Sequence, residues 1–128
     1  MHDSHDMEGR MKLTLLLFIL YHKLKKAAKT NTAFKSYIGT MRVKICIKTA
    51  DGKRGRLFVF DKGTVSSRRG GGHTADASLV WADPATGFSV MASGSDEASF
   101  MAAAHGKLKV EGMAYYIQWF TDGIKMIL

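Results

Sequence analysis

The chain has 128 residues and a mass of 14.1 kDa, a size that fits one compact domain and excludes a large multidomain enzyme. Hydrophobic residues make up 46% of it and prolines number one, which excludes wholesale disorder. The formal net charge of +8 favours anionic partners such as phosphates, nucleic acid or an acidic membrane surface. That charge is uneven, because residues 10–69 hold sixteen basic and two acidic side chains.

The first part of the chain predicts one long helix. Residues 1–10 are polar without periodicity and indicate a flexible tail, and residues 11–128 then form a single domain. Residues 11–28 contain no glycine or proline and are rich in Leu, Lys and Ala, which predicts an apolar and basic helix. Its apolar run, Leu13 to Tyr21, is about half of the roughly 20 residues that a membrane span needs. The basic stretch at residues 22–26 disfavours a signal peptide, so we expect a cytoplasmic protein, with peripheral membrane contact as an option.

From residue 41 the hydrophobic pattern changes to a period of two residues. Residues 41–48 alternate apolar and mostly basic side chains, predicting a half-buried strand with a basic outer face. Asp51-Gly52 suits a hairpin turn into a strand at Arg56 to Phe60, and Lys62-Gly63 turns into a third at Thr64 to Arg68. These three strands predict an antiparallel meander.

Two strands and three helices are predicted in the second half. Residues 75–82 alternate again as a fourth strand, and Asp83-Pro84 begins a helix that Ser93-Gly94 ends. Ser95 caps the next helix, which closes at Gly106. Residues 107–112 form a fifth strand, and residues 113–128 form a final helix with one polar stripe.

The order of these elements and several sequence motifs resemble the sterol carrier protein 2 family. The resemblance rests on Ala75-Asp76-Ala77-Ser78-Leu79, the acidic helix start at Asp83, the Ser93-Gly94 break, and the run from Ser95 to Gly106-Lys107-Leu108-Lys109-Val110-Glu111-Gly112. It covers roughly residues 30–128. It implies an α+β fold, a mixed five-stranded sheet with helices packed over one face, and an apolar tunnel between the layers.

The resemblance also implies a function without chemistry. Family members bind sterols, fatty acids, acyl-CoA or phospholipids, and bacterial relatives linked to quinone biosynthesis suggest an isoprenoid. We therefore expect binding and transfer of an apolar lipid, or alternatively a lipid-presenting accessory subunit of a membrane-associated enzyme system. The C-terminus lacks the Ser-Lys-Leu type of address that some relatives use for peroxisomes.

The candidate lipid-binding residues are bulky apolar side chains, many of them aromatic or thioether. Without the resemblance, the favoured interpretation is that these residues simply fill the core; with it, lipid lining and core filling are equally favoured. The set is Phe58, Trp81, Phe88, Met91, Phe100, Met101, Tyr116, Trp119, Phe120 and Ile124.

Basic residues supply candidate headgroup or membrane contacts. Lys23, Lys25 and Lys26 follow the apolar run, an arrangement that suits an anionic bilayer interface. The alternative is that helix 11–28 packs on its own domain or on a second copy as a homodimer. Arg68 and Arg69 precede a triple-glycine loop that either holds a phosphate or simply connects two strands.

Other functions are less favoured. The only cysteine, Cys46, excludes an internal disulfide and has no sequence partner, and the histidines are scattered, so we expect no metal, no cofactor and no enzyme activity. A nucleic-acid-binding domain is a further alternative. It would use a basic sheet face, but the aromatic residues are not interleaved with these charges for base stacking. The residues of that face would be Arg42, Lys44, Lys48, Lys53, Arg54 and Arg56.

Overall fold

A five-stranded mixed sheet forms one layer of the computed structural model, which describes the backbone of residues 2–128 and the side chains of residues 7–128. The strands run in the order β3-β2-β1-β4-β5. β1 and β4 pair in parallel and every other neighbouring pair is antiparallel, so the predicted meander and mixed sheet are confirmed. The strands are β1 Arg42–Thr49, β2 Gly55–Asp61, β3 Thr64–Arg69, β4 Ala77–Trp81 and β5 Leu108–Gly112.

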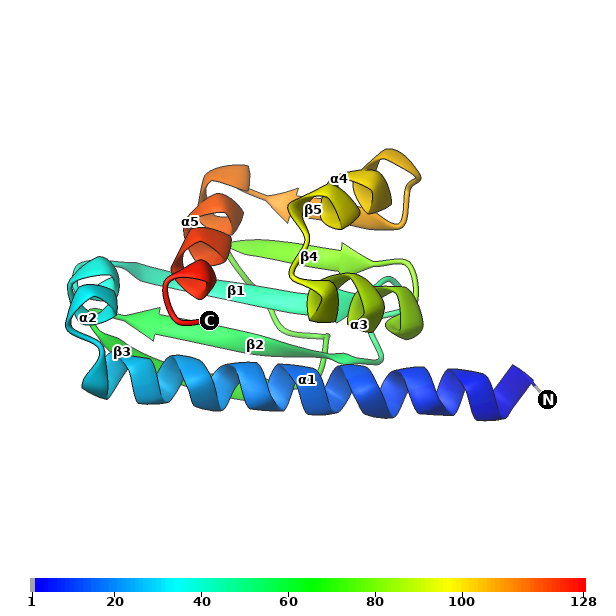
Figure 1. Ribbon diagram of the computed structural model, residues 1–128, viewed down its shortest axis with the longest axis horizontal. Helices are drawn as coiled ribbons and strands as arrows, with labels where there is room; N and C mark the ends of the chain where they lie inside the picture. The colour runs from blue at the N-terminus through cyan, green and yellow to red at the C-terminus, as the bar shows by residue number, and fades with distance from the viewer. Residues whose placement is uncertain (1) are drawn as a thin grey trace.

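Five helices form the second layer, over one face of this sheet (Figure 1). α1 runs along the β2–β3 side and packs against α3, while α5 crosses β1 and β4. Within residues 2–128, the other face of the sheet carries no helix (Figure 1). The helices are α1 His2–Thr30, α2 Thr32–Ile38, α3 Pro84–Ser93, α4 Asp96–Ala104 and α5 Ala114–Lys125.

α1 is longer than the sequence predicts, because it begins at His2 rather than at Met11. Gly9 lies within this extension and is buried against α3, where a Cβ would meet Ala85 at 3.1 Å. The absence of a side chain at Gly9 therefore lets two helices approach closely. The start of the helix, which we predicted at residue 11, is corrected accordingly. Among the described residues, no helix has the length and apolar character that crossing a membrane requires.

One stripe of α1 anchors it to the domain. The stripe repeats at intervals of three and four residues, the spacing that keeps side chains on one helix face. Its members are all buried: Leu13, Leu17, Leu20, Leu24 and Ala27. Other apolar side chains of the same helix remain exposed, so α1 is apolar on more than its packed face.

The predicted helix starts are confirmed by their caps. Asp83 Oδ1 accepts a hydrogen bond from the Thr86 amide at 2.8 Å, and Ser95 Oγ accepts one from the Ala98 amide at 3.1 Å. These bonds satisfy amides that have no partner within the helix. The caps fix where α3 and α4 begin, and α3 begins three residues after Trp81, at the end of β4.

The alternation in β1 places its side chains as expected. Val43, Ile45 and Ile47 face the helices and are buried, whereas Arg42 and Lys44 on the other face are exposed. Cys46 shares that second face but is fully buried. Its register partners there are Leu57 and Ser78, both buried, so the centre of the helix-free face is closed even without a covering layer.

Candidate functional site: an apolar cavity

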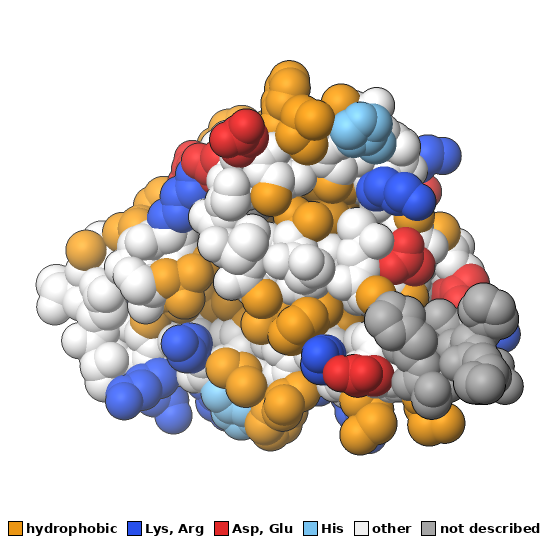
Figure 2. Space-filling view, turned by 45° about the vertical axis from the view of Figure 1, so that its right-hand side comes forward, with side chains coloured by type: hydrophobic (Ala, Val, Ile, Leu, Met, Phe, Trp, Pro, Cys, Tyr) orange, Lys and Arg blue, Asp and Glu red, His pale blue; other side chains and the backbone are white. Residues whose placement is uncertain are grey.

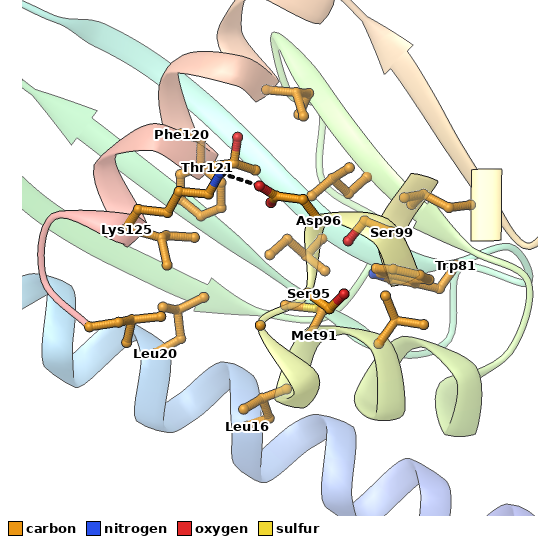
Figure 3. Close-up of a pocket in the computed structure, with 18 of the residues that line it drawn as sticks. Leu16, Leu20, Trp81, Met91, Ser95, Asp96, Ser99, Phe120, Thr121 and Lys125 are labelled. Carbon is orange, nitrogen blue, oxygen red and sulfur yellow. Dashed lines mark hydrogen bonds and ion pairs between the residues drawn. The ribbon is translucent and has the colours of Figure 1, made fainter. Parts of the chain in front are cut away.

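A cavity of about 370 Å³ lies between the sheet and four helices (Figure 3). Its floor comes from the sheet, with Ile47 of β1 and Leu79 and Trp81 of β4. Leu16 and Leu20 of α1 form one wall and point toward the cavity in Figure 3. This volume lies within the range of small-molecule sites, which is about 300–1,000 Å³.

α3 and α5 supply further apolar walls. Met91 and Val90 reach the cavity from α3, and Phe120 and Ile124 reach it from α5. Apolar side chains thus surround the space on the sheet side and on three helix sides. Such a lining excludes water without offering it hydrogen bonds, which favours an apolar occupant.

One side of the cavity is polar. Ser95, Asp96 and Ser99 contribute from the start of α4. The Nζ of Lys125, at the end of α5, lies 2.9 Å from Asp96 Oδ2, drawn as a dashed line in Figure 3. This hydrogen-bonded ion pair raises the pKa of Lys125. Charge therefore gathers at the border of an otherwise apolar space.

Trp81 brings a single unpaired donor into the cavity. Its side chain is 2% exposed, and its Nε1 has no hydrogen-bond partner among the described residues. The indole nitrogen points toward the cavity in Figure 3. A buried donor without a partner costs roughly 1–3 kcal/mol, which makes this N–H a strong candidate for contact with an occupant.

Four of the ten predicted lipid-binding residues line the cavity: Trp81, Met91, Phe120 and Ile124. Of the basic residues predicted to contact a headgroup, Lys23 also lines it, from α1. The structure thus brings together residues from four separate elements whose proximity the sequence did not establish.

Two predicted lining residues lie in solid core instead. Phe58 is fully buried and packs beside Phe120, with 5.4 Å between ring centroids. Trp119 stacks on Tyr37 at 5.5 Å, and Phe60 meets its edge at 5.0 Å. α5 has more than one apolar face, so one face fills the core while the next lines the cavity.

The remaining four lie at the periphery. Phe100 is 74% exposed and Met101 is also exposed, because this side of α4 faces solvent. Phe88 and Tyr116 are partly buried against the core without reaching the cavity. The sequence placed these aromatic residues on apolar helices, but it did not indicate which helix sides are covered.

Sequence reasoning missed the contribution of α1 and of small aliphatic residues. Leu16, Ile19 and Leu20 form a wall, and Val110 of β5 completes the sheet side. The sequence did carry a signal, since the first half of the helix predicted at residues 11–28 is apolar on all sides. That pattern does not indicate which side of the helix meets the cavity. Only the packed stripe of α1 fixes which flank meets the cavity.

The other predicted headgroup contacts lie apart from the cavity. Lys25 and Lys26 are exposed on α1, and the Lys25 Nζ lies 5.8 Å from the Tyr21 ring centroid. Arg68 pairs with Leu57 on the helix-free face of the sheet, whereas the next residue, Arg69, is on the α1 side. The two arginines therefore belong to opposite faces.

The basic sheet face that a nucleic-acid binder needs is divided in the same way. Arg42 forms an ion pair with Asp61 at 3.0 Å, and Lys48 forms one with Glu111 at 3.4 Å, both on the helix-free face. Arg56 lies on the other face beneath α1. Within residues 7–128, no group of three or more His, Cys, Asp or Glu side chains is arranged to hold a metal.

Comparisons with known proteins show which solved structures share this architecture. The sequence matches no protein-family model and no curated protein. The solved structure of the ubiquinone synthesis protein UbiJ-SCP2 is similar, with a TM-score of 0.64 and 16% identity over 88% of this chain and 91% of that one. A crystal structure of sterol carrier protein 2 is also similar, with a TM-score of 0.53 and 18% identity over 84% of this chain and 92% of that one.

A third similar structure comes from an insect. Sterol carrier protein 2 like 2 from Aedes aegypti gives a TM-score of 0.52 and 15% identity over 88% of this chain and 96% of that one. All three similarities cover most of both chains. The chain has the sterol carrier protein 2 fold.

Proposed function

We propose that this protein binds one apolar lipid in the cavity and transfers it without chemical change. The cavity itself carries the proposal, because a mostly apolar space of about 370 Å³ between four helices and a sheet is suited to a hydrocarbon guest. At about 0.8 kcal/mol per buried methylene, a sixteen-carbon chain gains roughly 12 kcal/mol, against association and ordering costs of about 4–15 kcal/mol. Micromolar binding is the expected scale.

The unpaired donor narrows the chemistry of the guest. Trp81 Nε1–H offers one hydrogen bond inside the apolar walls, and Ser95 and Ser99 lie on the polar side. A lipid with one or two acceptor oxygens at its end satisfies this donor, whereas a pure hydrocarbon leaves it unpaired. Fatty acids, sterols, acylated phospholipids and quinone precursors all carry such oxygens. Similarity to a ubiquinone synthesis protein favours testing an isoprenoid quinone precursor first.

Ligand extraction tests the proposal directly. The folded protein is extracted with organic solvent, the extract is examined by mass spectrometry, and the emptied protein is titrated with a fluorescent fatty acid. Val90→Trp is the matched variant, because Val90 lines the cavity and a larger side chain there occupies its volume. We expect loss of binding in this variant with an unchanged circular dichroism spectrum. Absence of both copurifying lipid and saturable binding in the native chain refutes the proposal.

The protein's setting follows from this activity. A carrier exchanges its lipid at a membrane surface, so we propose a cytoplasmic protein that visits membranes peripherally. Transfer of a fluorescent lipid between donor and acceptor vesicles measures this exchange, and a rate equal to the protein-free rate contradicts it.

A lipid-presenting subunit is the second candidate. It is favoured by the similarity to UbiJ-SCP2, which is described as a ubiquinone synthesis protein. A subunit of this kind keeps its lipid while an enzyme acts on the exposed end. Vesicle transfer near the spontaneous rate, together with retained lipid binding, distinguishes it from a free carrier.

A further inference from the structure

A second hollow lies on the other flank of α1, away from the cavity. Its volume is about 540 Å³, and it opens between α1 and the neighbouring ends of β2 and β3. Arg10 of α1 lines it together with three arginines near the start of β2 and the end of β3, beside apolar side chains of α1. We call this hollow the arginine groove; its members are Arg10, Arg54, Arg56, Arg69, Thr14, Met7, Met11, Leu15 and Phe18.

Arg56 is the least ordinary member of the groove. This residue is only 8% exposed, and its Nη1 donates a hydrogen bond of 2.7 Å to Ser67 Oγ. Its guanidinium carbon lies 5.8 Å from the Phe18 ring centroid and 5.9 Å from that of Tyr21. Cation–π contacts and one hydroxyl hold the group in place, but they leave most of its donors and its positive charge uncompensated.

Arg69 makes the charge imbalance greater. It is the direct cross-strand partner of Arg56 in the β2–β3 ladder, so two like charges face each other. Like charges in this position are destabilising. Burial lowers the pKa of Arg56, and the nearby charge of Arg69 lowers it further. The fold therefore maintains a cationic pair at a cost that an anion would offset.

No described carboxylate supplies that anion. None of the salt bridges within residues 7–128 includes an arginine of the groove; the four are Lys12–Glu8, Arg42–Asp61, Lys48–Glu111 and Lys125–Asp96. Hydrogen bonds from Thr49 and from the Lys53 amide lower the pKa of Asp51, and the charge of Arg10 adds only a smaller lowering. Both of these hydrogen bonds are accepted by Oδ1 of Asp51.

A smaller hollow continues the groove along the sheet. Its volume is about 200 Å³, and it shares Thr14, Arg54, Arg56 and Arg69 with the groove before reaching Lys53 and Gly70. Guanidinium groups bind phosphate oxygens in bidentate geometry, and several of them converging on one hollow suit a phosphate group. The basic part of the groove is thus built for an anion of that size.

The apolar part of the groove indicates what carries the phosphate. Met7, Met11, Leu15 and Phe18 recur every three or four residues along α1, and all four are exposed. Hydrophobic side chains lie at the surface along α1, at the lower edge of Figure 2. An exposed apolar stripe beside a basic cluster matches the boundary between the headgroups and acyl chains of a bilayer. A soluble phosphate would have no use for the stripe.

We propose that the arginine groove binds the phosphate headgroup of an anionic membrane lipid while the neighbouring α1 stripe enters the acyl region. The site lies across the packed stripe of α1 from Leu16 and Ile19, which line the cavity. It is therefore independent of the cavity and of its ligand. Membrane binding at this groove differs from the contact predicted from sequence, which used Lys23, Lys25 and Lys26.

The full chain is tested by co-sedimentation with phosphatidylglycerol–phosphatidylcholine vesicles and with phosphatidylcholine vesicles. Arg54→Gln with Arg69→Gln removes two exposed charges from the groove. Lys44→Gln with Arg68→Gln is the matched control, because it removes two exposed charges from the opposite face of the same sheet. From the usual contribution of a basic residue near an anionic surface, the groove pair is expected to weaken binding by roughly thirtyfold. The control pair is expected to change it by less than about threefold.

A second pair of variants tests the stripe. Met11→Ser changes a stripe residue that is 68% exposed, and Met113→Ser changes a methionine that is 60% exposed elsewhere. We expect only Met11→Ser to reduce vesicle binding. Equal losses of vesicle binding in the groove pair and the control pair would show that only net charge matters, and this would overturn the proposal. No loss of binding in either pair would overturn it as well. If the groove instead binds inorganic phosphate saturably and the protein does not bind vesicles, the proposal that the phosphate belongs to a membrane lipid is overturned.

Discussion

Gly87 packs against Trp81, so close that a Cβ at Gly87 would be 2.9 Å from Trp81 Cγ. α3 can approach β4 at this point only because the side chain is absent. The contact packs the Cβ, Cγ and Cδ1 side of Trp81 against α3, and the indole nitrogen points toward the cavity in Figure 3. One glycine on a helix thereby packs against the residue whose buried N–H lacks a partner among the described residues.

Gly87→Ala is expected to destabilise the fold by about 1–3 kcal/mol, because the added methyl group overpacks a buried contact. Urea unfolding followed by circular dichroism measures the change. Gly72→Ala is the control, since a Cβ at Gly72 meets nothing within 4 Å. Equal stability of the two variants would show that the Gly87–Trp81 contact is not as tight as described.

Trp81→Phe is expected to reduce the affinity for an oxygen-bearing lipid by roughly three- to tenfold, because it removes one hydrogen bond from an apolar site. The affinity for a lipid without acceptor atoms should change much less. Competition against a fluorescent fatty acid gives both values. Trp119→Phe is the control, since Trp119 lies outside the cavity, and a matching loss there would contradict the assigned role of Trp81.

Trp119→Arg is expected to unfold the protein rather than to block lipid entry alone. Trp119 is buried between Tyr37 and Phe60, and the Tyr37 hydroxyl donates a hydrogen bond of 2.7 Å to its carbonyl. An unpaired charge in this core has no compensating partner. Circular dichroism and thermal melting measure the outcome. A folded variant that has lost only lipid binding would place Trp119 at the cavity instead.

Cys46 makes stability depend on pH in the alkaline range. Burial raises the pKa of this thiol above its ordinary value of 9.0, so the folded protein keeps the proton that the unfolded chain releases. The free energy of unfolding is therefore unaffected below about pH 9 and falls as the pH rises beyond it. Cys46→Ala should flatten that decline in urea titrations at several pH values. The same slope in both proteins would assign it to other groups, such as Tyr37, whose pKa is also raised by burial.

The sequence predicted the elements well because their signals are local. Alternation in residues 41–48 depends on neighbouring side chains, and the caps at Asp83 and Ser95 depend on the next three residues. The start of α1 was misplaced, because the close approach at Gly9 is a contact between helices distant in sequence. No local pattern records it.

The candidate site was only partly predictable for a related reason. Helical spacing groups side chains on faces, but the sequence does not say which neighbour covers each face. Trp119 and Ile124 belong to one apolar helix, yet one packs against Tyr37 and the other lines the cavity. The same uncertainty hid Arg56, which reads as an outer strand residue until α1 is placed over it.

The parallel pairing of β1 with β4 sets the order in which the chain can assemble. Ile47 pairs with Leu79 in the middle of the sheet, although the whole β2–β3 hairpin lies between them in sequence. Closing such a loop costs entropy before its contacts return any stability, and a high share of distant contacts slows folding. We expect the hairpin to form early and the sheet centre to close late. The floor of the lipid site, Ile47 beside Leu79, would then be among the last parts to become native.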